Sequence, residues 1–299
     1  MRIAVTGHKG QIATALLEKA HETNVEIFSI GRPELDMAEP SSIRHMLKNI
    51  AVDAIVSAAA YTAVDRAENE PETAFAVNAE GAGAVAEVAA SLDIPILHLS
   101  TDYVFSGDKT SNYEETDAPA PLSVYGRSKL AGEQHVAQIA ANHAIIRTSW
   151  VYSPFGANFV KTMLRLAETR NVLRVVDDQI GSPTSALDIA GALLAIAQRL
   201  VGDTDPALRG VFHMTGTGRA SWADFATEIF ATLKNRTGRT IIVERIGTSD
   251  YPTAARRPLN SLLSNEKLKA TYEIILPDWR TSTRIVTERI LDTEGEYPS

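Results

Sequence analysis

The sequence predicts an α/β fold in which a doubly wound parallel sheet is accompanied by a smaller C-terminal domain. Three observations predict it. Short apolar runs alternate with helical segments from residue 1 to about residue 152, which is the pattern of consecutive βαβ units. A glycine turn joins the first apolar run to the first helix. The chain has 299 residues, which is long enough for one large and one small domain.

The first βα unit predicts a dinucleotide site. Residues 2–6 form a short apolar run, and a glycine turn separates them from a helical stretch at 16–20. In that turn Gly7 permits a tight bend and Gly10 lets the backbone approach a pyrophosphate. The small Ala13 lets the helix pack close to the sheet, so that the N–H groups of the helix face the phosphates.

The second unit predicts which cofactor is preferred. Residues 25–30 form a strand that ends in Gly31 and Arg32, and a helix is expected over 39–47. A carboxylate at this strand end would hold an adenosine 2′-hydroxyl, whereas an arginine attracts a 2′-phosphate. Arg32 therefore favours NADPH over NADH. The alternative interpretation is a surface arginine without a ligand.

The third and fourth strands are expected at residues 53–57 and 94–99. Small residues follow the third strand up to Thr62, which suits a cofactor that crosses the edge of the sheet. The acidic residues between 65 and 70 are interpreted as the solvated start of an alanine-rich helix. The fourth strand leads into Thr101, which in a parallel sheet faces the same crevice as the glycine turn.

Tyr125 and Lys129 are the central candidates for catalysis. They are four residues apart and so lie on one face of the predicted helix. Taken alone, this spacing also fits a solvated helix face with an extended lysine. Because Thr101 ends a neighbouring strand, however, we expect it to meet Tyr125 with a carbonyl group between them. A fifth strand is predicted at residues 143–148.

The second half of the chain predicts a domain that covers the crevice. We expect 1–152 to form the dinucleotide-binding domain, with a return to it at about 173–215, and 153–172 and 216–299 to form the substrate-binding domain. Arg256 and Arg257 in a proline-containing loop suggest a clamp for a phosphate, with exposed loop charges as the alternative. The further elements are expected as a helix at 158–169, a strand at 173–176, a helix at 185–199, a strand at 211–214, a helix from 221 and a strand at 241–245.

Composition excludes several classes of function. The net charge of −8 and the absence of a basic stripe argue against nucleic-acid binding. No apolar run approaches the ~18 residues that a membrane span requires, and we expect no leader. There is no cysteine, and the seven histidines form no HxxH or HxxxH pair, so we expect no metal site. We expect a cytoplasmic protein with no nucleic-acid or membrane partner.

Together these motifs resemble those of the extended short-chain dehydrogenase/reductases, which share the Rossmann fold, and more narrowly those of the dTDP-4-dehydrorhamnose reductase family. The glycine turn and the Tyr125/Lys129 pair are common to the whole superfamily. Three stretches are more specific to this family, namely residues 100–105, 147–152 and 257–261.

The resemblance implies hydride transfer from NADPH, with NADH as a weaker donor, to the 4-keto group of dTDP-4-dehydro-L-rhamnose. Tyr125 would donate the proton, and Lys129 would hold the nicotinamide ribose and favour the phenolate. Thr101 would take the place of the usual serine that hydrogen-bonds the carbonyl. The implied substrate contacts are Thr101, Asp102, Trp150, Asn158 and Arg257. The implied cofactor contacts are Gly7, Gly10, Gln11, Ile12, Arg32, Asp36, Met37, Ala60, Tyr61, Thr62, Tyr125 and Lys129.

One departure from the family pattern concerns metal. Position 15 is alanine, where some relatives carry an acidic residue that helps to bind magnesium between subunits, so no metal-linked dimer is expected. Monomer and homodimer both remain open. Two other functions also remain open: a non-catalytic, NADP-binding regulatory subunit of the methionine adenosyltransferase type, and a related nucleotide-sugar epimerase or dehydratase. The latter is disfavoured because the usual acidic pattern of dehydratases beside Thr101 and Tyr125 is missing.

Overall fold

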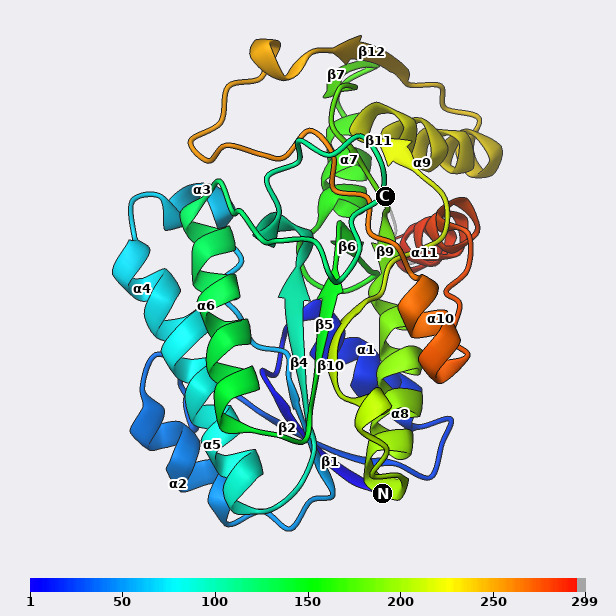
Figure 1. Cartoon of the computed structure of the whole chain (residues 1–299). Helices are drawn as coiled ribbons and strands as arrows, with labels where there is room; N and C mark the ends of the chain where they lie inside the picture. The colour runs from blue at the N-terminus through cyan, green and yellow to red at the C-terminus, as the bar shows by residue number, and fades with distance from the viewer. Residues whose placement is uncertain (295–299) are drawn as a thin grey trace.

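A six-stranded sheet forms the centre of the computed structural model, which describes residues 1–294 (Figure 1). Its strand order is β10-β5-β4-β3-β1-β2, and every neighbouring pair is parallel. The prediction of a doubly wound parallel sheet is therefore confirmed. The strands are β1 (Arg2–Thr6), β2 (Glu26–Ile30), β3 (Ala54–Ser57), β4 (Ile96–Thr101), β5 (His143–Thr148) and β10 (Gly210–His213).

Helices cover both faces of this sheet. On one face α1 packs against α8, and on the other α5 packs between α2 and α6 (Figure 1). Ile3 and Val5 of β1 pack on the α1 side with Leu16, while Ala4 packs on the opposite side with Val85. Both faces are thus buried, as in other parallel sheets. The bounds are α1 (Gln11–Ala20), α2 (Pro40–Lys48), α5 (Gly81–Ser91), α6 (Val124–Ile139) and α8 (Ala186–Gly202).

The segment between β3 and α5 is less regular than the single helix that we expected. It contains two short helices, α3 (Val64–Ala67) and α4 (Pro71–Phe75), and a π-helical turn, η1 (Ala76–Glu80). The π turn places the Asn78 side chain against the loop after β3, where it accepts from the Tyr61 N–H at 2.8 Å. A π turn inserts one extra residue into a helix and often lies at a functional site.

A second, smaller group of elements lies beyond the carboxyl ends of the strands (Figure 1). Strands β7 and β12 form a parallel pair, and α9 packs against both strands and against α7 and α11. Phe225 and Trp279 lie fully buried in the core of this group. The bounds are α7 (Phe159–Ala167), β7 (Val172–Val176), α9 (Trp222–Thr237), β12 (Ile242–Ile246) and α11 (Trp279–Glu294).

Short elements connect these two parts. Strand β6 pairs with β9, and β8 pairs with β11. The short elements are η2 (Asp102–Val104), β6 (Val151–Tyr152), β8 (Ile180–Gly181), β9 (Thr184–Ser185), η3 (Pro206–Leu208), β11 (Ala220–Ser221), η4 (Thr248–Asp250) and α10 (Glu266–Tyr272).

The pairing of β7 differs from the expected return of the chain to the first domain at residue 173. β7 pairs with β12 and not with the central sheet, because its apolar residues Leu173 and Val175 pack against α9. The return begins with α8, and α10 also packs on the sheet side, against β10. We propose that the dinucleotide-binding domain includes α8, β10 and α10, and that 153–185 belong to the second domain.

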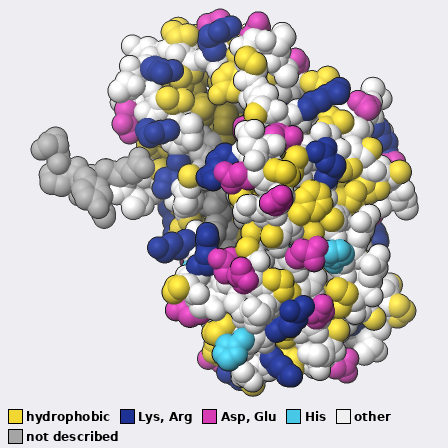
Figure 2. All heavy atoms as spheres, turned by 90° about the vertical axis from the view of Figure 1, so that its left-hand side faces the viewer, with side chains coloured by type: hydrophobic (Ala, Val, Ile, Leu, Met, Phe, Trp, Pro, Cys, Tyr) yellow, Lys and Arg dark blue, Asp and Glu magenta, His cyan; other side chains and the backbone are white. Residues whose placement is uncertain are grey.

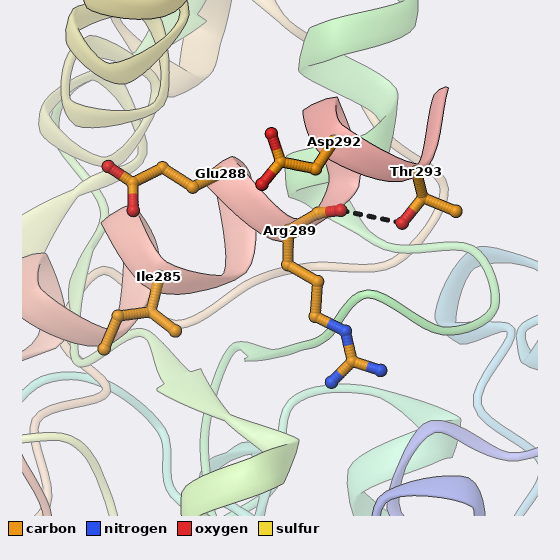
Figure 3. Close-up of a pocket in the computed structure, with 5 residues that line it drawn as sticks. All are labelled: Ile285, Glu288, Arg289, Asp292 and Thr293. Carbon is orange, nitrogen blue, oxygen red and sulfur yellow. Dashed lines mark hydrogen bonds between the residues drawn. The ribbon is translucent and has the colours of Figure 1, made fainter. Parts of the chain in front are cut away.

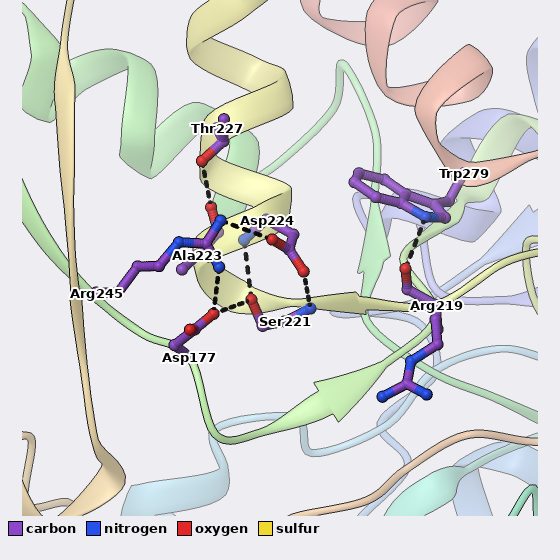
Figure 4. A network of polar contacts seen from close by, with 8 residues as sticks. All are labelled: Asp177, Arg219, Ser221, Ala223, Asp224, Thr227, Arg245 and Trp279. Atoms are coloured by element: carbon purple, nitrogen blue, oxygen red, sulfur yellow. Dashed lines mark hydrogen bonds and ion pairs between the residues drawn. The ribbon is translucent and has the colours of Figure 1, made fainter.

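An ion-pair network ties α9 to the paired strands of the second part (Figure 4). The Arg245 guanidinium contacts Asp177 at 2.6 Å and Asp224 at 2.8 Å. Ser221 and Asp224 form a capping box at the start of α9, which satisfies backbone N–H groups that the helix itself leaves free. We call these four residues the Arg245 network.

The surface shows mixed charge on the face seen in Figure 2, where acidic and basic side chains are interspersed. None of the helices formed by residues 1–294 combines the length and apolar character needed to cross a membrane. Within the same residues, no three acidic or histidine side chains come together in a way that could hold a metal ion.

Candidate active site

The carboxyl end of β4 presents Thr101 and Asp102, both buried. Thr101 is the N-cap of η2, and its hydroxyl accepts the backbone N–H of Tyr103 at 3.2 Å. The same hydroxyl donates to Asp102 Oδ1 at 2.9 Å. The Thr101 side chain is therefore held in one orientation by two neighbours in the chain.

Helix α6 brings Tyr125 to this strand end. Ser123 caps the helix by accepting the Gly126 N–H at 3.1 Å. Gly126 lies against the segment after β4, since a Cβ at that position would come within 2.2 Å of the Tyr103 carbonyl oxygen. Only glycine permits so close an approach. Thr101 and Tyr125 meet as the sequence predicted, close enough for the Thr101 hydroxyl to lower the pKa of the Tyr125 phenol.

The Tyr125 phenol stays protonated over the physiological range. Burial raises its pKa to about 12, the nearby charge of Asp102 acts in the same direction, and the Thr101 hydroxyl opposes them. The ring packs edge-on against Tyr103, with 5.6 Å between the ring centroids. A phenol in this state can donate a proton to an oxygen atom that gains negative charge.

The resemblance implied that Lys129 favours the Tyr125 phenolate, but Lys129 is not among the groups that shift the pKa of Tyr125. Its buried ammonium donates to the Leu99 carbonyl at 2.6 Å and lies 3.5 Å from His98 Nε2. One helical turn beyond Tyr125, the lysine meets β4 two residues before Thr101. Burial lowers the pKa of Lys129 to about 8, and the charge of Glu133 opposes this shift.

A buried ion pair fixes α6 against the sheet. Glu133 accepts two hydrogen bonds from Arg147 of β5, at 2.9 and 2.7 Å, and one from the Ser100 hydroxyl of β4 at 2.5 Å. Sequence reasoning did not single out these residues. We call them the Glu133 cluster, and they join the strand that carries Thr101 to the helix that carries Tyr125.

The glycine turn has the geometry that a dinucleotide site requires. Gly7 adopts a φ of 100°, which favours glycine. A Cβ at Gly10 would meet nothing within 4 Å, and no side chain caps the start of α1. The first N–H groups of α1 are thus available to an anion. Gln11 accepts from Ser153 at 2.8 Å and from Asn158 at 3.0 Å.

Asn158 thus lies beside a predicted cofactor residue, although the sequence predicted it as a substrate contact. It also caps α7 by accepting the Lys161 N–H at 3.2 Å. Arg32 is exposed directly after β2. His8, which sequence reasoning missed, joins the glycine turn to this strand end, because its ring accepts the Gly31 N–H at 3.0 Å. The position of His8 inside the glycine turn is the sequence feature that could have identified it.

The other predicted cofactor residues lie along the same edge of the sheet. Tyr61 is held at both backbone groups by Asn78, which sequence reasoning also missed. The Asp36 carboxylate accepts the Ala38 N–H at 3.0 Å, and Met37 is buried. The remaining residues lie in the first turn of α1 or in the loop after β3, namely Ile12, Ala60 and Thr62.

Trp150 stacks on Trp222 of α9, with 3.6 Å between ring centroids and 6° between the ring planes. Trp222 donates to the Gln179 side chain at 3.2 Å. Sequence reasoning identified Trp150 but missed Trp222, which lies 72 positions later in the second part of the molecule. This stack connects the end of the central sheet to the second part.

Asp65 lies in the acidic stretch that was expected as a solvated helix start, and its side chain is 44% exposed, but it also makes a contact that the sequence did not predict. Its carboxylate accepts from Arg257 at 2.8 Å and from the Ala255 N–H at 3.0 Å, so it fixes the loop from the second part. Arg257 is therefore already paired, while Arg256 is exposed. The clamp for a phosphate stays a prediction. Glu68 likewise accepts the Val124 N–H at the start of α6, at 2.8 Å.

A hollow of about 360 Å³ lies elsewhere, on α11, and contains none of the predicted site residues (Figure 3). One of its lining residues, Arg289, contacts Glu18 of α1 through two 2.6 Å hydrogen bonds. This pair connects α11 to the first helix of the glycine-turn unit.

Known proteins similar to this chain decide the family. The family model described as "RmlD substrate binding domain" matches residues 1–291. A dTDP-4-dehydrorhamnose reductase of Sinorhizobium fredii is 54% identical over 284 residues, which are 95% of this chain and 96% of that protein. The chain belongs to the dTDP-4-dehydrorhamnose reductase family.

Two solved structures extend this result to the fold. A dTDP-4-dehydrorhamnose reductase of Clostridium acetobutylicum superposes with a TM-score of 0.90 at 34% identity, covering 97% of this chain and 99% of that one. The reductase of Bacillus anthracis, solved in complex with NADP, gives a TM-score of 0.89 at 33% identity, covering 96% and 99%. The family resemblance that the sequence indicated is thus confirmed over almost the whole chain.

Proposed function

We propose that this protein transfers hydride from NADPH to the 4-keto group of dTDP-4-dehydro-L-rhamnose and releases dTDP-L-rhamnose. Membership of the reductase family supports the reaction, and the NADP complex of the Bacillus anthracis relative supports the cofactor. The observation that carries the proposal is the protonated Tyr125 phenol beside Thr101 at the carboxyl end of β4. NADH would serve as a weaker donor.

The residues around the glycine turn fit a dinucleotide. The uncapped start of α1 and the open space at Gly10 leave room for a pyrophosphate. NADPH, when bound, supplies the hydride. Arg32 would hold its 2′-phosphate and Lys129 its nicotinamide ribose. The further residues proposed to hold it are Gly7, Gln11, Ile12, Asp36, Met37, Ala60, Tyr61 and Thr62.

Thr101, Tyr125 and Lys129 are the proposed catalytic residues. As hydride reaches the carbonyl carbon, the carbonyl oxygen gains charge, and Tyr125 donates its proton to that oxygen. When its own proton is free, Thr101 donates a hydrogen bond to the same oxygen and so stabilises the charge. Lys129, held at the Leu99 carbonyl, keeps a positive charge one turn below the phenol.

The sugar nucleotide would lie between the two parts of the molecule. Trp150 offers an aromatic face that its stack with Trp222 holds rigid. Asp102 Oδ2 and Arg257 Nε are buried and have no hydrogen-bond partner among the described residues, so both are available to a polar ligand. Asn158 completes the proposed substrate contacts from the side of Gln11.

Replacement of Tyr125 by phenylalanine tests the proposal. The variant keeps the ring but loses the proton donor, so kcat should fall by ~10²–10⁴-fold. NADPH binding should survive, because the glycine turn and Lys129 are unchanged. Single-turnover reduction of the keto sugar measures the first effect, and NADPH fluorescence titration measures the second. Tyr103→Phe removes a neighbouring hydroxyl and is the matched control.

Two outcomes would overturn this function. A parent protein that binds NADPH but never oxidises it with the keto sugar would favour the regulatory-subunit alternative. Release of a product with an inverted or dehydrated sugar and no net consumption of NADPH would favour the epimerase or dehydratase alternative. We further propose that the enzyme acts in the cytoplasm, as a monomer or a homodimer.

A further inference from the structure

The Thr101 hydroxyl carries a single proton, and the structure shows where that proton points. Thr101 Oγ1 donates to Asp102 Oδ1 at 2.9 Å and accepts the Tyr103 N–H at 3.2 Å. A ketone oxygen can only accept a hydrogen bond, so Thr101 can polarise it only if its own proton is free. An ionised Asp102 therefore competes with the substrate for this proton.

The environment of Asp102 favours a carboxyl group that changes its protonation state near neutral pH. The side chain is 2% exposed, and its Oδ2 has no hydrogen-bond partner among the described residues. A buried, unpaired carboxylate oxygen is costly. Burial raises the pKa of Asp102 to about 6. The Thr101 hydroxyl, the backbone of Asp102 and Tyr103, and a Ser261 hydroxyl that lies nearby without forming a hydrogen bond to Oδ2 act in the opposite direction.

The other titratable groups around this carboxyl do not change charge near the same pH. Burial raises the pKa of Tyr125, on α6, to about 12. Burial also raises the pKa of Tyr103, next in the chain to Asp102. Arg257, whose charge acts on Tyr103, is paired with Asp65. Lys129 is directed to the Leu99 carbonyl, and its pKa is about 8.

We propose that Asp102 is a positioning residue that sets the direction of the Thr101 hydrogen bond in the proposed reduction. When protonated, the carboxyl donates to Thr101 Oγ1, and the Thr101 proton turns to the ketone oxygen. When ionised, the carboxylate takes the Thr101 hydrogen bond for itself. The Asp102 proton stays on Asp102 during the reaction, because the proton that reaches the product comes from Tyr125.

The consequence is a rate that depends on pH in a defined direction. Hydride transfer is fast below the pKa of Asp102 and slows as the pH rises through it, since the ketone oxygen then loses one of its two donors. Loss of one such donor lowers a rate by about 10²–10³-fold. An ionised Asp102 competes for the Thr101 proton but does not remove the hydroxyl, so we expect the rate of hydride transfer to fall by only about ten- to a hundredfold.

The test compares pH profiles of the parent, Asp102→Asn and Thr101→Ala. Hydride transfer is followed by NADPH absorbance at saturating NADPH and sub-saturating dTDP-4-dehydro-L-rhamnose, because kcat/KM reports the pKa values of the enzyme before the sugar binds. The parent should lose rate with a midpoint near the pKa of about 6. In Asp102→Asn the amide donates to Thr101 at every pH, so this loss should disappear. Thr101→Ala should react more slowly than the parent and should also show no loss of rate near this pH. The double variant, Asp102→Asn with Thr101→Ala, should be no slower than Thr101→Ala alone.

Each outcome decides the inference. The inference is overturned if Asp102→Asn still loses rate near pH 6 as the parent does. It is also overturned if Asp102→Asn is slower than the parent by the same factor at every pH and has a raised KM. If Asp102→Asn does not fold, a Thr101→Ala protein that still shows the loss overturns it instead. A parent that never reduces the keto sugar overturns the proposed function and this inference together, whereas the first results overturn this inference alone.

Discussion

The Glu133 cluster and the Arg245 network contain similar ion pairs in opposite surroundings. In the first, the Arg147 and Glu133 side chains are 4% and 5% exposed and 2.7 Å apart. In the second, the Arg245, Asp177 and Asp224 side chains are 47%, 37% and 39% exposed, at 2.6 and 2.8 Å. The distances are nearly equal, so they do not show which group contributes more to stability.

Burial decides which of these ion pairs matters more for stability, because water screens the exposed pairs of Arg245 but not the buried pair of Arg147 and Glu133. Loss of one partner from a buried pair leaves a charge without solvent, whereas an exposed partner is simply hydrated. The buried cluster joins β4 to α6, the two elements that carry Thr101 and Tyr125. The exposed network holds the second part of the molecule, which would contact the substrate. The buried ion pair thus lies in the region where the proposed proton transfer takes place.

The largest effect on stability is expected from Glu133→Gln. It leaves the Arg147 charge buried without its counter-charge, which costs ~3–5 kcal/mol of the free energy of unfolding. Urea denaturation followed by circular dichroism measures this loss. The control is Glu133→Gln combined with Arg147→Met, which removes both charges and should recover most of the stability. Equal losses in the single and double variants would show that the unpaired charge is not the cause.

Arg32 is an exposed charge for which we expect an effect on cofactor binding and not on stability, because we propose that it contacts a ligand. Arg32→Ala should leave the free energy of unfolding nearly unchanged. It should remove a charge-assisted contact worth ~1.5–3 kcal/mol to the 2′-phosphate, which raises the KM for NADPH about ten- to a hundredfold. The KM for NADH, which lacks this phosphate, is the internal control and should hardly change. Equal use of both cofactors by the parent would contradict the role of Arg32.

Hydrophobic patterns in the sequence predicted the central sheet well. The strands at 2–6 and 143–148 were predicted with the bounds that the structure gives to β1 and β5. The meeting of Thr101 and Tyr125 followed from the common direction of parallel strands. These features depend on residues close in sequence or on one rule of topology, and one sequence is enough to infer them.

Contacts between distant segments could not be predicted in the same way. Asp65 and Arg257 are separated by 192 positions, and no local period relates an acidic helix to a loop arginine. The Trp222 partner of Trp150, the pairing of β7 with β12 and the Lys129 contact with the Leu99 carbonyl all depend on how the second part or α6 packs. Packing of side chains decides such contacts, and several arrangements satisfy the same hydrophobic pattern.

The smallest effect is expected from Arg245→Ala in the exposed network. Although Arg245 contacts two carboxylates, its side chain is 47% exposed, so each pair is screened by water. Its removal should lower the free energy of unfolding by only ~0.2–1 kcal/mol, because Asp177 and Asp224 become hydrated and Ser221 still caps α9. Arg174→Ala, which breaks an exposed pair with Glu244 at 3.3 Å, is the matched control and should cost about as little. Urea denaturation at low and high salt measures both variants, and the small loss should shrink further at high salt. A loss for Arg245→Ala as large as that for Glu133→Gln would mean that geometry, and not burial, ranks the ion pairs of this protein.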